Sequence, residues 1–498
     1  MRTLTLVTAV AVALVASAVA ERNFTEDVLL RPLPGLGKVV AHFRFKQGAA
    51  GSTVPSEQHF GSFPKHIRQV MHKFDVDAFQ LTFTNGLWRH GQWGEALGHG
   101  PFGALLEANV PSEAAFQGLA QTLAGIFSAS LNKMNARAVN TKGSFAYQAN
   151  LAREELCTEN LSPWLKLLPC RAHAGLGTFV HPLHVLDSDF ISMSVRVTRD
   201  LAMEQSLTFV KRVDGHDWTL ASLLGAASTT VCPLATQSSV TTELSTDKSS
   251  ALMLPPTTVE RHRNAYRHIV PLATVSSVDA PWLAAPAPAA AKSTWSSVSA
   301  HRYLTGYGQV RGGIAIALHN RDTKTPVRVS YDETIPWYLR VYFSTLRVAL
   351  NGRLLTSSEY ALEMTPASRT GSPGHLRLVL ELPPKSRIDI GYAFDKAFLP
   401  LEAHPPDANR GFDVAAARVR VDRGKATTTL YTEPLLVPLP TPDFSMPYNV
   451  ICLTSTVVSM TLGSLVNTLL RHERKKTNIA KLFDVLKQLF RKIKPKQA

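Results

Sequence analysis

Short runs of apolar and β-branched residues, several of them alternating with polar positions, recur through the first 235 residues and predict strands. The clearest runs are VVAHFRF at 39–45, AFQLTF at 78–83, FISMSVRV at 190–197 and LTFVKRV at 207–213. The stretch from Ser112 to Met134 instead follows a helical period, with Ser112 as a suitable N-cap. Its apolar stripe consists of Phe116, Leu119, Leu123, Ile126 and Phe127. Residues 21–235 are therefore expected to form an α+β domain that packs this helix into its core.

Beyond residue 300 the pattern becomes almost entirely β. The predicted strands are GIAIAL at 313–318, VRVSY at 327–331, WYLRVYFSTLRVAL at 337–350, LRLVLEL at 376–382 and IDIGYAF at 388–394. Gly and Pro separate these runs, which predicts an antiparallel β-sandwich over residues 300–445. The Ser/Thr-rich stretch 236–250 and the Pro/Ala tract 281–297 have linker compositions, so residues 236–299 are expected to be linker-rich.

A long stretch without charged side chains lies near the carboxyl end, from Tyr448 to Leu470. As a helix with a rise of about 1.5 Å per residue it is long enough for the roughly 30 Å hydrocarbon core of a bilayer. Its many small and hydroxylated residues are typical of helices that pack inside membranes. The sequence predicts one transmembrane helix over residues 446–470, with a buried helix of a soluble domain as the alternative. The expected fold class is mainly β, with β-sandwich-like lumenal domains, some α-structure in the N-terminal part and this single span.

The two ends of the chain predict its topology. Residues 1–20 contain one Arg, an apolar stretch and the sequence Ala18-Val19-Ala20, which together indicate a secretory signal peptide. Basic residues dominate 471–498, and basic flanks stay in the cytosol. The tail is therefore expected to be cytosolic and the bulk of the chain lumenal. Because this tail supplies much of the net charge of +15, the charge does not indicate a nucleic-acid partner.

Two further signals lie in the basic tail. Apolar residues recur at steps of three and four over 479–493, which predicts an amphipathic helix suited to an anionic cytosolic leaflet. Lys494 and Lys496 match the K-x-K-x-x pattern of a dilysine retrieval signal. The expected localisation is the endoplasmic-reticulum membrane.

The cysteines and glycosylation sequons follow this topology. Cys452 lies in the predicted span, so Cys157, Cys170 and Cys232 remain in the oxidising compartment. Because three is an odd number, one thiol is either free or bonded to another chain. Asn23 and Asn160 each begin an N-glycosylation sequon, although Pro163 directly after the second lowers its expected efficiency.

Signals for catalysis are absent from the sequence. It has no G-x-S-x-G, H-E-x-x-H or C-x-x-C pattern. His181, His184, Asp187 and Asp189 are residue types that ligate zinc, but His181 and His184 differ by three positions and would face opposite sides of a strand. A surface loop is the favoured interpretation. No metal, no cofactor and no enzymatic activity of the chain itself are expected.

Several longer stretches together resemble the GPI transamidase subunit PIG-T family. The strongest runs from Leu430 to Ser459, ahead of and into the predicted span. The others, in the family's order, are FTNGLWRHGQWG at 83–94, LCTENLSPWLKLLPC at 156–170, HRYLTGYGQVRGG at 301–313 and ETIPWYLRVYFSTLRV at 333–348. The resemblance therefore extends over nearly the whole mature chain.

The resemblance implies a function. GPI transamidase of the endoplasmic-reticulum membrane cleaves the C-terminal signal of a proprotein and joins the new carboxyl end to a GPI lipid. Catalysis belongs to the PIG-K subunit, and PIG-T-like chains act as a lumenal scaffold that holds PIG-K alongside GPAA1, PIG-S and PIG-U. This chain is therefore expected to be a non-catalytic subunit. The alternative is a type I membrane receptor or adhesion protein with a β-rich ectodomain, and a third possibility is a hydrolase with an unrecognised site.

The resemblance also implies a disulfide pattern. The family's C-T-E-N-L motif supplies the cysteine that bonds to the catalytic subunit, and Cys157 is the matching residue. Cys170 and Cys232 would then pair within the chain. A local bond between Cys157 and Cys170, leaving Cys232 over, is the rival pattern. A closely spaced cysteine pair of animal relatives is absent near 190–200.

The Pro-rich stretch 433–447 leads into the predicted span. Its prolines predict that it does not pair regularly as a strand. It is expected to descend stiffly to the bilayer and to set the height of the lumenal part above the membrane.

Overall fold

The structure is a computed structural model. The structure describes residues 22–49, 63–134, 137–139, 145–213, 217–219, 223–224, 230–244, 258–262, 265–271, 281–283, 298–306, 308–368, 371–404, 410–424, 427–441, 445–469 and 478–492. The expected signal peptide and the retrieval residues Lys494 and Lys496 lie outside these ranges. The chain divides into a unit that holds the sheets and a unit that holds the two C-terminal helices, each described by itself.

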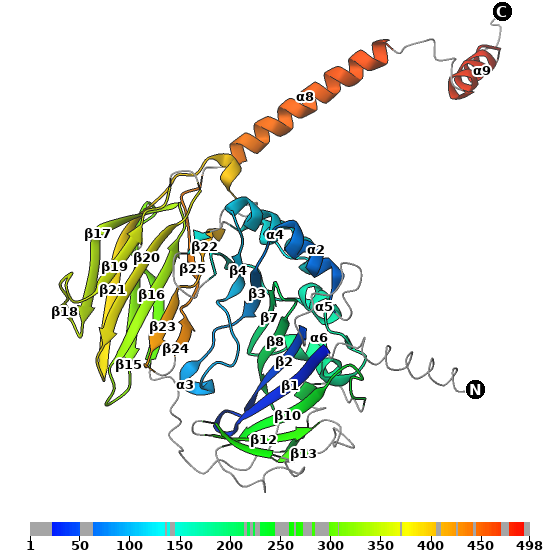
Figure 1. Cartoon of the computed structure of the whole chain (residues 1–498). Coiled ribbons are helices and arrows are strands. Elements are labelled where there is room, and N and C mark those ends of the chain that lie inside the picture. The colour runs from blue at the N-terminus through cyan, green and yellow to red at the C-terminus, as the bar shows by residue number, and fades with distance from the viewer. Residues whose placement is uncertain are drawn as a thin grey trace, which may run out of the picture. The chain divides into compact units, whose positions relative to one another are not determined.

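An eleven-stranded sheet forms the N-terminal part of the larger unit (Figure 1). Its strands, in spatial order, are β11 (Thr258–His262), β12 (Ala265–Pro271), β10 (Gln237–Leu244), β1 (Arg22–Leu33), β2 (Lys38–Ala49), β8 (Met203–Arg212), β7 (Phe190–Thr198), β3 (Ala78–Asn85), β4 (Gly103–Asn109), β6 (Tyr147–Leu151) and β5 (Arg137–Ala138). Neighbouring strands are antiparallel except β1 and β10, which are parallel. The four strand-like runs of this region are β2, β3, β7 and β8.

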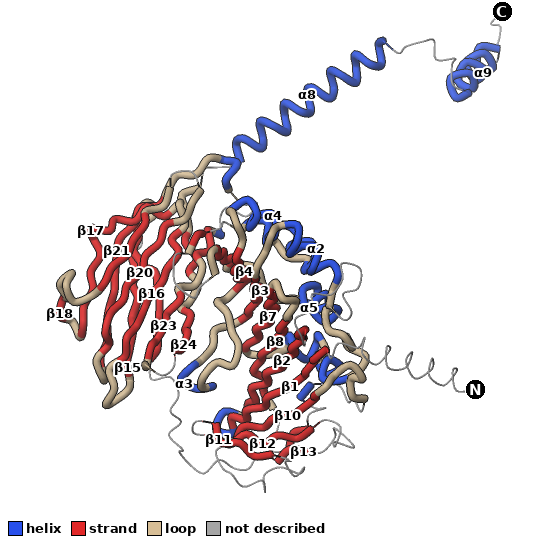
Figure 2. Tube along the Cα trace, viewed as in Figure 1, coloured by secondary structure: helices blue, strands red, loops and turns tan. Residues whose placement is uncertain are grey.

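Helices cover one face of this sheet. They are α2 (Lys65–Lys73), α4 (Glu113–Phe127), α5 (Thr158–Lys166) and the short α6 (Pro182–Leu186), as Figures 1 and 2 show together. The predicted helix begins as expected, because the Ser112 hydroxyl accepts a hydrogen bond of 3.2 Å from the Ala115 N–H. It ends earlier than expected, at Phe127, because Ser128 adopts a left-handed conformation. Of the predicted stripe, all but the partly buried Ile126 are fully buried.

Two five-stranded antiparallel sheets form the C-terminal sandwich. The first contains β14 (Val298–Thr305), β15 (Arg311–Asn320), β21 (Ser386–Lys396), β17 (Leu339–Leu350) and β18 (Arg353–Leu354). The second contains β19 (Ala361–Thr365), β20 (Gly374–Leu382), β16 (Val327–Ile335), β23 (Arg418–Asp422) and β24 (Thr427–Tyr431). The expectation of a mainly β chain with an antiparallel sandwich is confirmed.

The structure also contains several smaller elements. They are α3 (His90–Trp93), the two-stranded sheets β9 (Asp217–Thr219) with β13 (Pro281–Leu283) and β22 (Phe412–Val414) with β25 (Leu435–Val437), and the 3-10 turns at Pro34–Leu36, Leu131–Lys133, Gly175–Phe179 and Leu401–Ala403. β25 corrects one expectation, because Leu435–Val437 of the Pro-rich stretch does pair, although only over three residues between Pro434 and Pro438.

The segment expected to be linker-rich contributes strands to the first sheet. Within it, β10 lies beside β1, and β12 and β11 extend the sheet from there. Ser/Thr composition alone therefore does not separate a strand of the sheet from a linker. The exact domain boundaries remain a prediction.

A buried ion pair lies in the sandwich core. Arg302 and Glu333 are 2.6 Å apart, and neither side chain is exposed. Glu333 also accepts hydrogen bonds from the hydroxyls of Tyr331 at 2.7 Å and Tyr392 at 2.8 Å. Buried charges are stable only when they are paired in this way.

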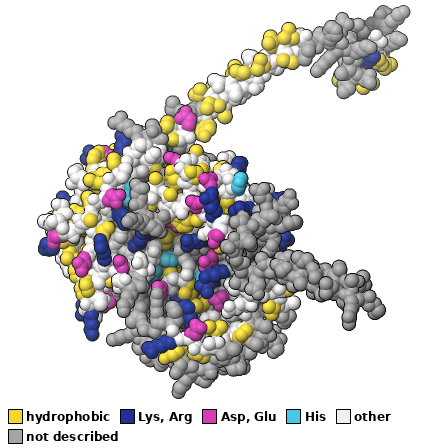
Figure 3. Space-filling view, viewed as in Figure 1, with side chains coloured by type: hydrophobic (Ala, Val, Ile, Leu, Met, Phe, Trp, Pro, Cys, Tyr) yellow, Lys and Arg dark blue, Asp and Glu magenta, His cyan; other side chains and the backbone are white. Residues whose placement is uncertain are grey.

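The smaller unit contains α8 (Ser445–Leu469) and α9 (Asn478–Lys492). In α8, residues Tyr448–Leu469 have the length and composition of a membrane span, and their side chains are not buried against protein. Figure 3 shows hydrophobic and uncharged side chains along this helix. The predicted single C-terminal span is confirmed as a candidate by length and composition among the described residues.

Candidate functional site

Cys157 occupies the N-cap position of α5, with its side chain exposed and its thiol not in a disulfide. Its backbone N–H donates a hydrogen bond of 3.0 Å to Oδ1 of Asn160, and its thiol donates to the same oxygen at 3.2 Å. Because the backbone and the thiol share one acceptor, the sulfur is held at the surface in a defined orientation.

Asn160 links this cysteine to the preceding helix. Only 1% of Asn160 is exposed, and its Nδ2 donates a hydrogen bond of 2.8 Å to the carbonyl oxygen of Phe127, the last residue of α4. Nδ2 is the atom that would carry an N-linked glycan, and in this fold it is buried and hydrogen-bonded. Glycosylation at Asn160 stays a prediction, and the structural role of its buried amide argues against it.

The rest of α5 is anchored to the sheet by Trp164. This side chain is fully buried, and its indole N–H donates a hydrogen bond of 2.9 Å to the carbonyl oxygen of Ser194 on β7. The Gln205 amide on β8 in turn donates to the carbonyl oxygen of Trp164 at 2.9 Å. The helix that presents Cys157 is thus fixed to two strands, and the thiol is carried on a rigid element.

Cys170 and Cys232 form a disulfide, with 5.9 Å between their Cα atoms and a sequence separation of 62. The bond joins the segment after α5 to the segment before β10. The rival bond between Cys157 and Cys170 is not formed in this structure. Cys157 therefore remains the one unpaired thiol among the described cysteines outside α8.

A buried carboxyl group and Cys232 both lie close to Gly175. Glu26 of β1 accepts hydrogen bonds from the Leu176 N–H at 3.0 Å and the Ser238 hydroxyl at 2.5 Å. Burial raises the pKa of Glu26 despite these hydrogen bonds. Gly175 has φ +71°, and a Cβ there would lie 2.4 Å from Oε1 of Glu26 and 2.8 Å from Cβ of Cys232. Only glycine fits at position 175, because any Cβ there would clash with Glu26 and Cys232.

The histidine and aspartate cluster does not converge on a metal site. His181 directly precedes α6 and His184 lies within it, with their ring centroids 5.4 Å apart. Asp189 instead forms an ion pair of 2.6 Å with Lys38, and hydrogen bonding from Lys38 lowers the pKa of Asp189 despite partial burial. Among the residues that the structure describes, no group of three or more His, Cys, Asp or Glu is arranged to hold a metal ion.

Sequence patterns did not predict the polar contact between the N-terminal sheet and the sandwich. Arg418 of β23 lies 3.1 Å from a carboxylate oxygen of Glu107 on β4, and Arg137 of β5 lies 3.2 Å from one of Asp332 on β16. Burial opposes ionisation of Asp332, but the hydrogen bond from His375 and the charges of Arg137 and Arg418 outweigh it and lower its pKa. No local sequence signal marks these residues, because their partners come from distant strands.

The remaining site residues are placed as follows. Asn23 belongs to β1, opposite Gly48 of β2. Cys452 is exposed on α8. Outside α8, geometry thus distinguishes one surface thiol on a rigid helix, and the residues that the structure describes offer no arrangement of catalytic groups at it.

Comparison with known proteins adds to this geometry. The family model described as "Gpi16 subunit, GPI transamidase component" matches residues 7–212 and 198–494. The human GPI-anchor transamidase component PIGT is 30% identical over 527 residues, covering 90% of each chain. The GPI transamidase component GPI16 of Saccharomyces cerevisiae is 28% identical and covers 90% of this chain and 88% of its own. Among solved structures, the Bacillus cereus major pilin subunit BcpA matches 29% of this chain and 41% of its own, at 10% identity and a TM-score of 0.21, which is too low to indicate a shared fold.

Proposed function

Because this chain belongs to the Gpi16 subunit family of GPI transamidase components, we propose that it is a non-catalytic scaffold subunit of GPI transamidase. In that role it stabilises the complex and holds a PIG-K-like catalytic subunit through a disulfide. GPAA1-, PIG-S- and PIG-U-like subunits are its other partners, and the GPI lipid and the proprotein reach it through the complex. The family match favours this role over that of a membrane receptor.

The observation that supports the scaffold role most directly is the exposed thiol of Cys157. It is unpaired while Cys170 and Cys232 are bonded to each other. It also lies on α5, which buried side chains fix to the sheet. A disulfide from such a position would keep a partner at high effective concentration without a large interface.

The proposed topology places the two sheet-containing parts in the endoplasmic-reticulum lumen, α8 in the membrane and the basic tail in the cytosol. A lumenal location gives Cys157 the oxidising environment that an interchain disulfide needs. The basic residues after α8 support this orientation. Protease treatment of sealed microsomes tests it, because the lumenal part should be protected and the tail should be removed.

The disulfide is tested by non-reducing electrophoresis after mild detergent extraction. The wild-type chain should migrate with the added mass of its partner, and reduction should abolish the shift. Cys157→Ser should abolish it without reduction, whereas the matched control Cys452→Ser should retain it. A shift that persists in Cys157→Ser, or the absence of a shift in the wild-type protein, would contradict the proposed bridge.

A further inference from the structure

The sandwich is open along the side where β17 and β19 face each other. β19 is the last strand of its sheet, and β17 is followed only by the two-residue β18, which pairs with Ala349 and Leu350. Over residues 339–346, β17 has a neighbour only on the β21 side among the described strands. Edge strands present unpaired backbone N–H and C=O groups to whatever lies beside them.

Strand register shows that this open side exposes core-facing residues. Leu362 lies opposite Leu378, and Met364 lies opposite Leu376. Directly opposed residues of antiparallel strands point to the same face of a sheet. Leu376 and Leu378 are completely buried, yet Leu362 is 37% exposed and Met364 is 47% exposed. The two β19 side chains therefore point toward the sandwich interior without being covered by it.

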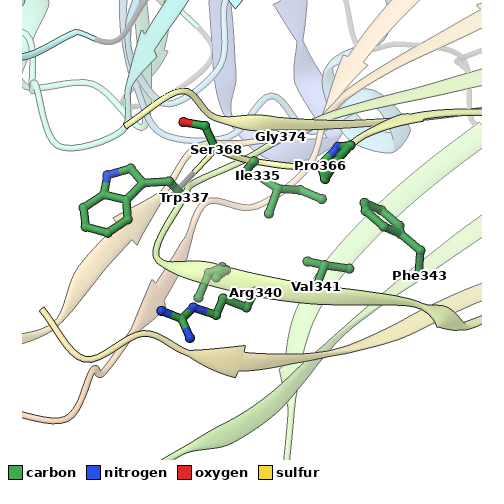
Figure 4. A pocket seen from close by; sticks show the side chains of 10 residues that line it. Ile335, Trp337, Arg340, Val341, Phe343, Pro366, Ser368 and Gly374 are labelled. Carbon is green, nitrogen blue, oxygen red and sulfur yellow. The ribbon is translucent and has the colours of Figure 1, made fainter. Parts of the chain in front are cut away.

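Apolar residues of β17 line a groove at this side of the sandwich (Figure 4). Val341 and Phe343 are only partly buried, and Trp337 and Pro366 continue the apolar lining. The groove has a volume of about 270 Å³. Exposed apolar surface of this kind often marks an interaction site.

Arg340 adds a charge to the groove. It lines the groove from β17, is exposed, and has no hydrogen-bond or ion-pair partner among the residues that the structure describes. Six of the lining residues, Arg340 included, come from the stretch 333–348 that resembles the PIG-T family. A ligand that fills the groove completely would therefore combine apolar groups with a negative charge.

We propose that this groove docks an extended polypeptide segment of another subunit. Apolar side chains of the segment cover Leu362 and Met364, a carboxylate pairs with Arg340, and its backbone bonds to the free edge of β17. A lipid chain would satisfy the apolar surface but would leave the strand edge without hydrogen-bond partners. The proposal rests on the proposed function only in taking the segment from a transamidase subunit.

Photo-crosslinking in the intact, detergent-extracted complex tests the proposal. A benzophenone amino acid replaces Met364 in one variant and Glu363 in its matched control. Glu363 is the adjacent residue of β19 but faces outward, where it lies 3.7 Å from Arg377. The Met364 variant should crosslink to one segment of another subunit, identified by mass spectrometry, and the Glu363 variant should not.

The outcomes at Met364 separate the possible occupants. A crosslink to lipid or to a second copy of this chain, or no crosslink at all, would overturn the proposal. An equal crosslink from Glu363 to the same segment would also overturn it, because the contact would then not be specific to the groove.

Charge variants provide a second measurement that does not depend on crosslinking. Met364→Lys and Arg340→Glu should each lower recovery of the docked subunit with the complex by about tenfold, as for other hot-spot positions. Glu363→Lys should leave recovery unchanged. The Cys157-linked partner should still be recovered with every variant, so failure of this proposal is distinguishable from failure of the proposed bridge. Unchanged recovery of all subunits in both Met364→Lys and Arg340→Glu would refute the docking role.

Discussion

The Asn160 side chain donates a hydrogen bond of 2.8 Å to the carbonyl oxygen of Phe127, and this contact joins the start of α5 to the end of α4. The same side chain accepts hydrogen bonds from the N–H and the thiol of Cys157. One buried amide therefore stabilises two helix ends and positions a surface cysteine. The asparagine that begins this sequon therefore has a structural role, because its amide connects α4 to α5.

Loss of this sequon should not change glycosylation. Ser162→Ala removes the acceptor pattern, while the hydroxyl it removes only donates to the exposed carbonyl of Thr158 at 2.8 Å. We expect the peptide that contains Asn160 to have its unmodified mass in wild-type and variant proteins, as checked by mass spectrometry after proteolysis. A glycan on that peptide in the wild-type protein would show that the fold around α5 differs from the one described.

Substitution of Asn160 itself should loosen the start of α5. Asn160→Ala leaves the Phe127 carbonyl and the Cys157 N–H without this partner, and loss of such a buried cap costs about 1–3 kcal/mol. The fraction of chain in the interchain disulfide, measured on a non-reducing gel, should fall. Ser162→Ala is the matched control, since it removes the same sequon without affecting these contacts.

Asn160→Asp separates the contact of residue 160 with Cys157 from its contact with Phe127. The carboxylate keeps an acceptor for Cys157 but cannot donate to Phe127. We expect it to retain more of the interchain bond than Asn160→Ala. Equal bridging in the wild-type, Ala and Asp variants would show that Asn160 does not position the thiol.

Removal of one partner of the buried ion pair should be strongly destabilising. Glu333→Gln leaves the guanidinium of Arg302 without its counter-charge in the sandwich core, at an expected cost of about 3–5 kcal/mol. Tyr331→Phe removes only one hydrogen bond to Glu333 and should cost about 1 kcal/mol. Denaturant unfolding of the detergent-solubilised chain, followed by tryptophan fluorescence, measures both.

An exposed ion pair provides the control for this comparison. Arg353 and Glu359 are also 2.6 Å apart, but both side chains are exposed to solvent. Glu359→Gln should therefore change the unfolding midpoint little. A similar loss of stability in Glu333→Gln and Glu359→Gln would contradict the argument from burial.

His42 should make the fold less stable in mild acid. Burial, helped by the nearby charges of Arg44, Arg31 and Arg267, lowers the pKa of His42 to about 3. An unfolded chain binds this proton near pH 6.5, whereas the folded chain resists protonation of His42 until about pH 3. The free energy of unfolding is therefore unaffected by His42 above pH 6.5 and falls progressively as the pH drops from 6.5 toward 3. Near pH 5 the loss from this residue is on the order of 2 kcal/mol.

The variant His42→Gln tests this pH dependence. Glutamine does not titrate and retains a polar group beside Thr208, whose hydroxyl lies 2.8 Å from Nδ1 of His42. Its unfolding midpoint should fall less between pH 7 and pH 5 than that of the wild-type protein. The slope should not vanish, because burial also lowers the pKa of His90 to about 3 and of His99 to about 4. An unchanged slope in His42→Gln would assign the acid sensitivity to other groups.

The sequence alone identified the elements whose pattern is local. Alternation predicted β2, β3, β7 and β8, the helical period and Ser112 predicted α4, and the uncharged stretch predicted the span in α8. The resemblance of several long stretches indicated the family, because it depends on residue order and not on packing. These features are encoded within one segment each, so no knowledge of distant contacts was needed.

Tertiary structure decided what depends on two distant segments meeting. β10 lies beside β1, although Ser238 and its hydrogen-bond partner Glu26 are 212 residues apart, so a Ser/Thr-rich stretch became a strand. The amide of Asn160, which begins a sequon, is buried and donates to the carbonyl oxygen of Phe127 on another helix. Leu362 and Met364 face inward but stay exposed because the opposing sheet ends before it covers them. Hydrophobic periodicity specifies which face of a strand is apolar, and only the assembled fold specifies what covers that face.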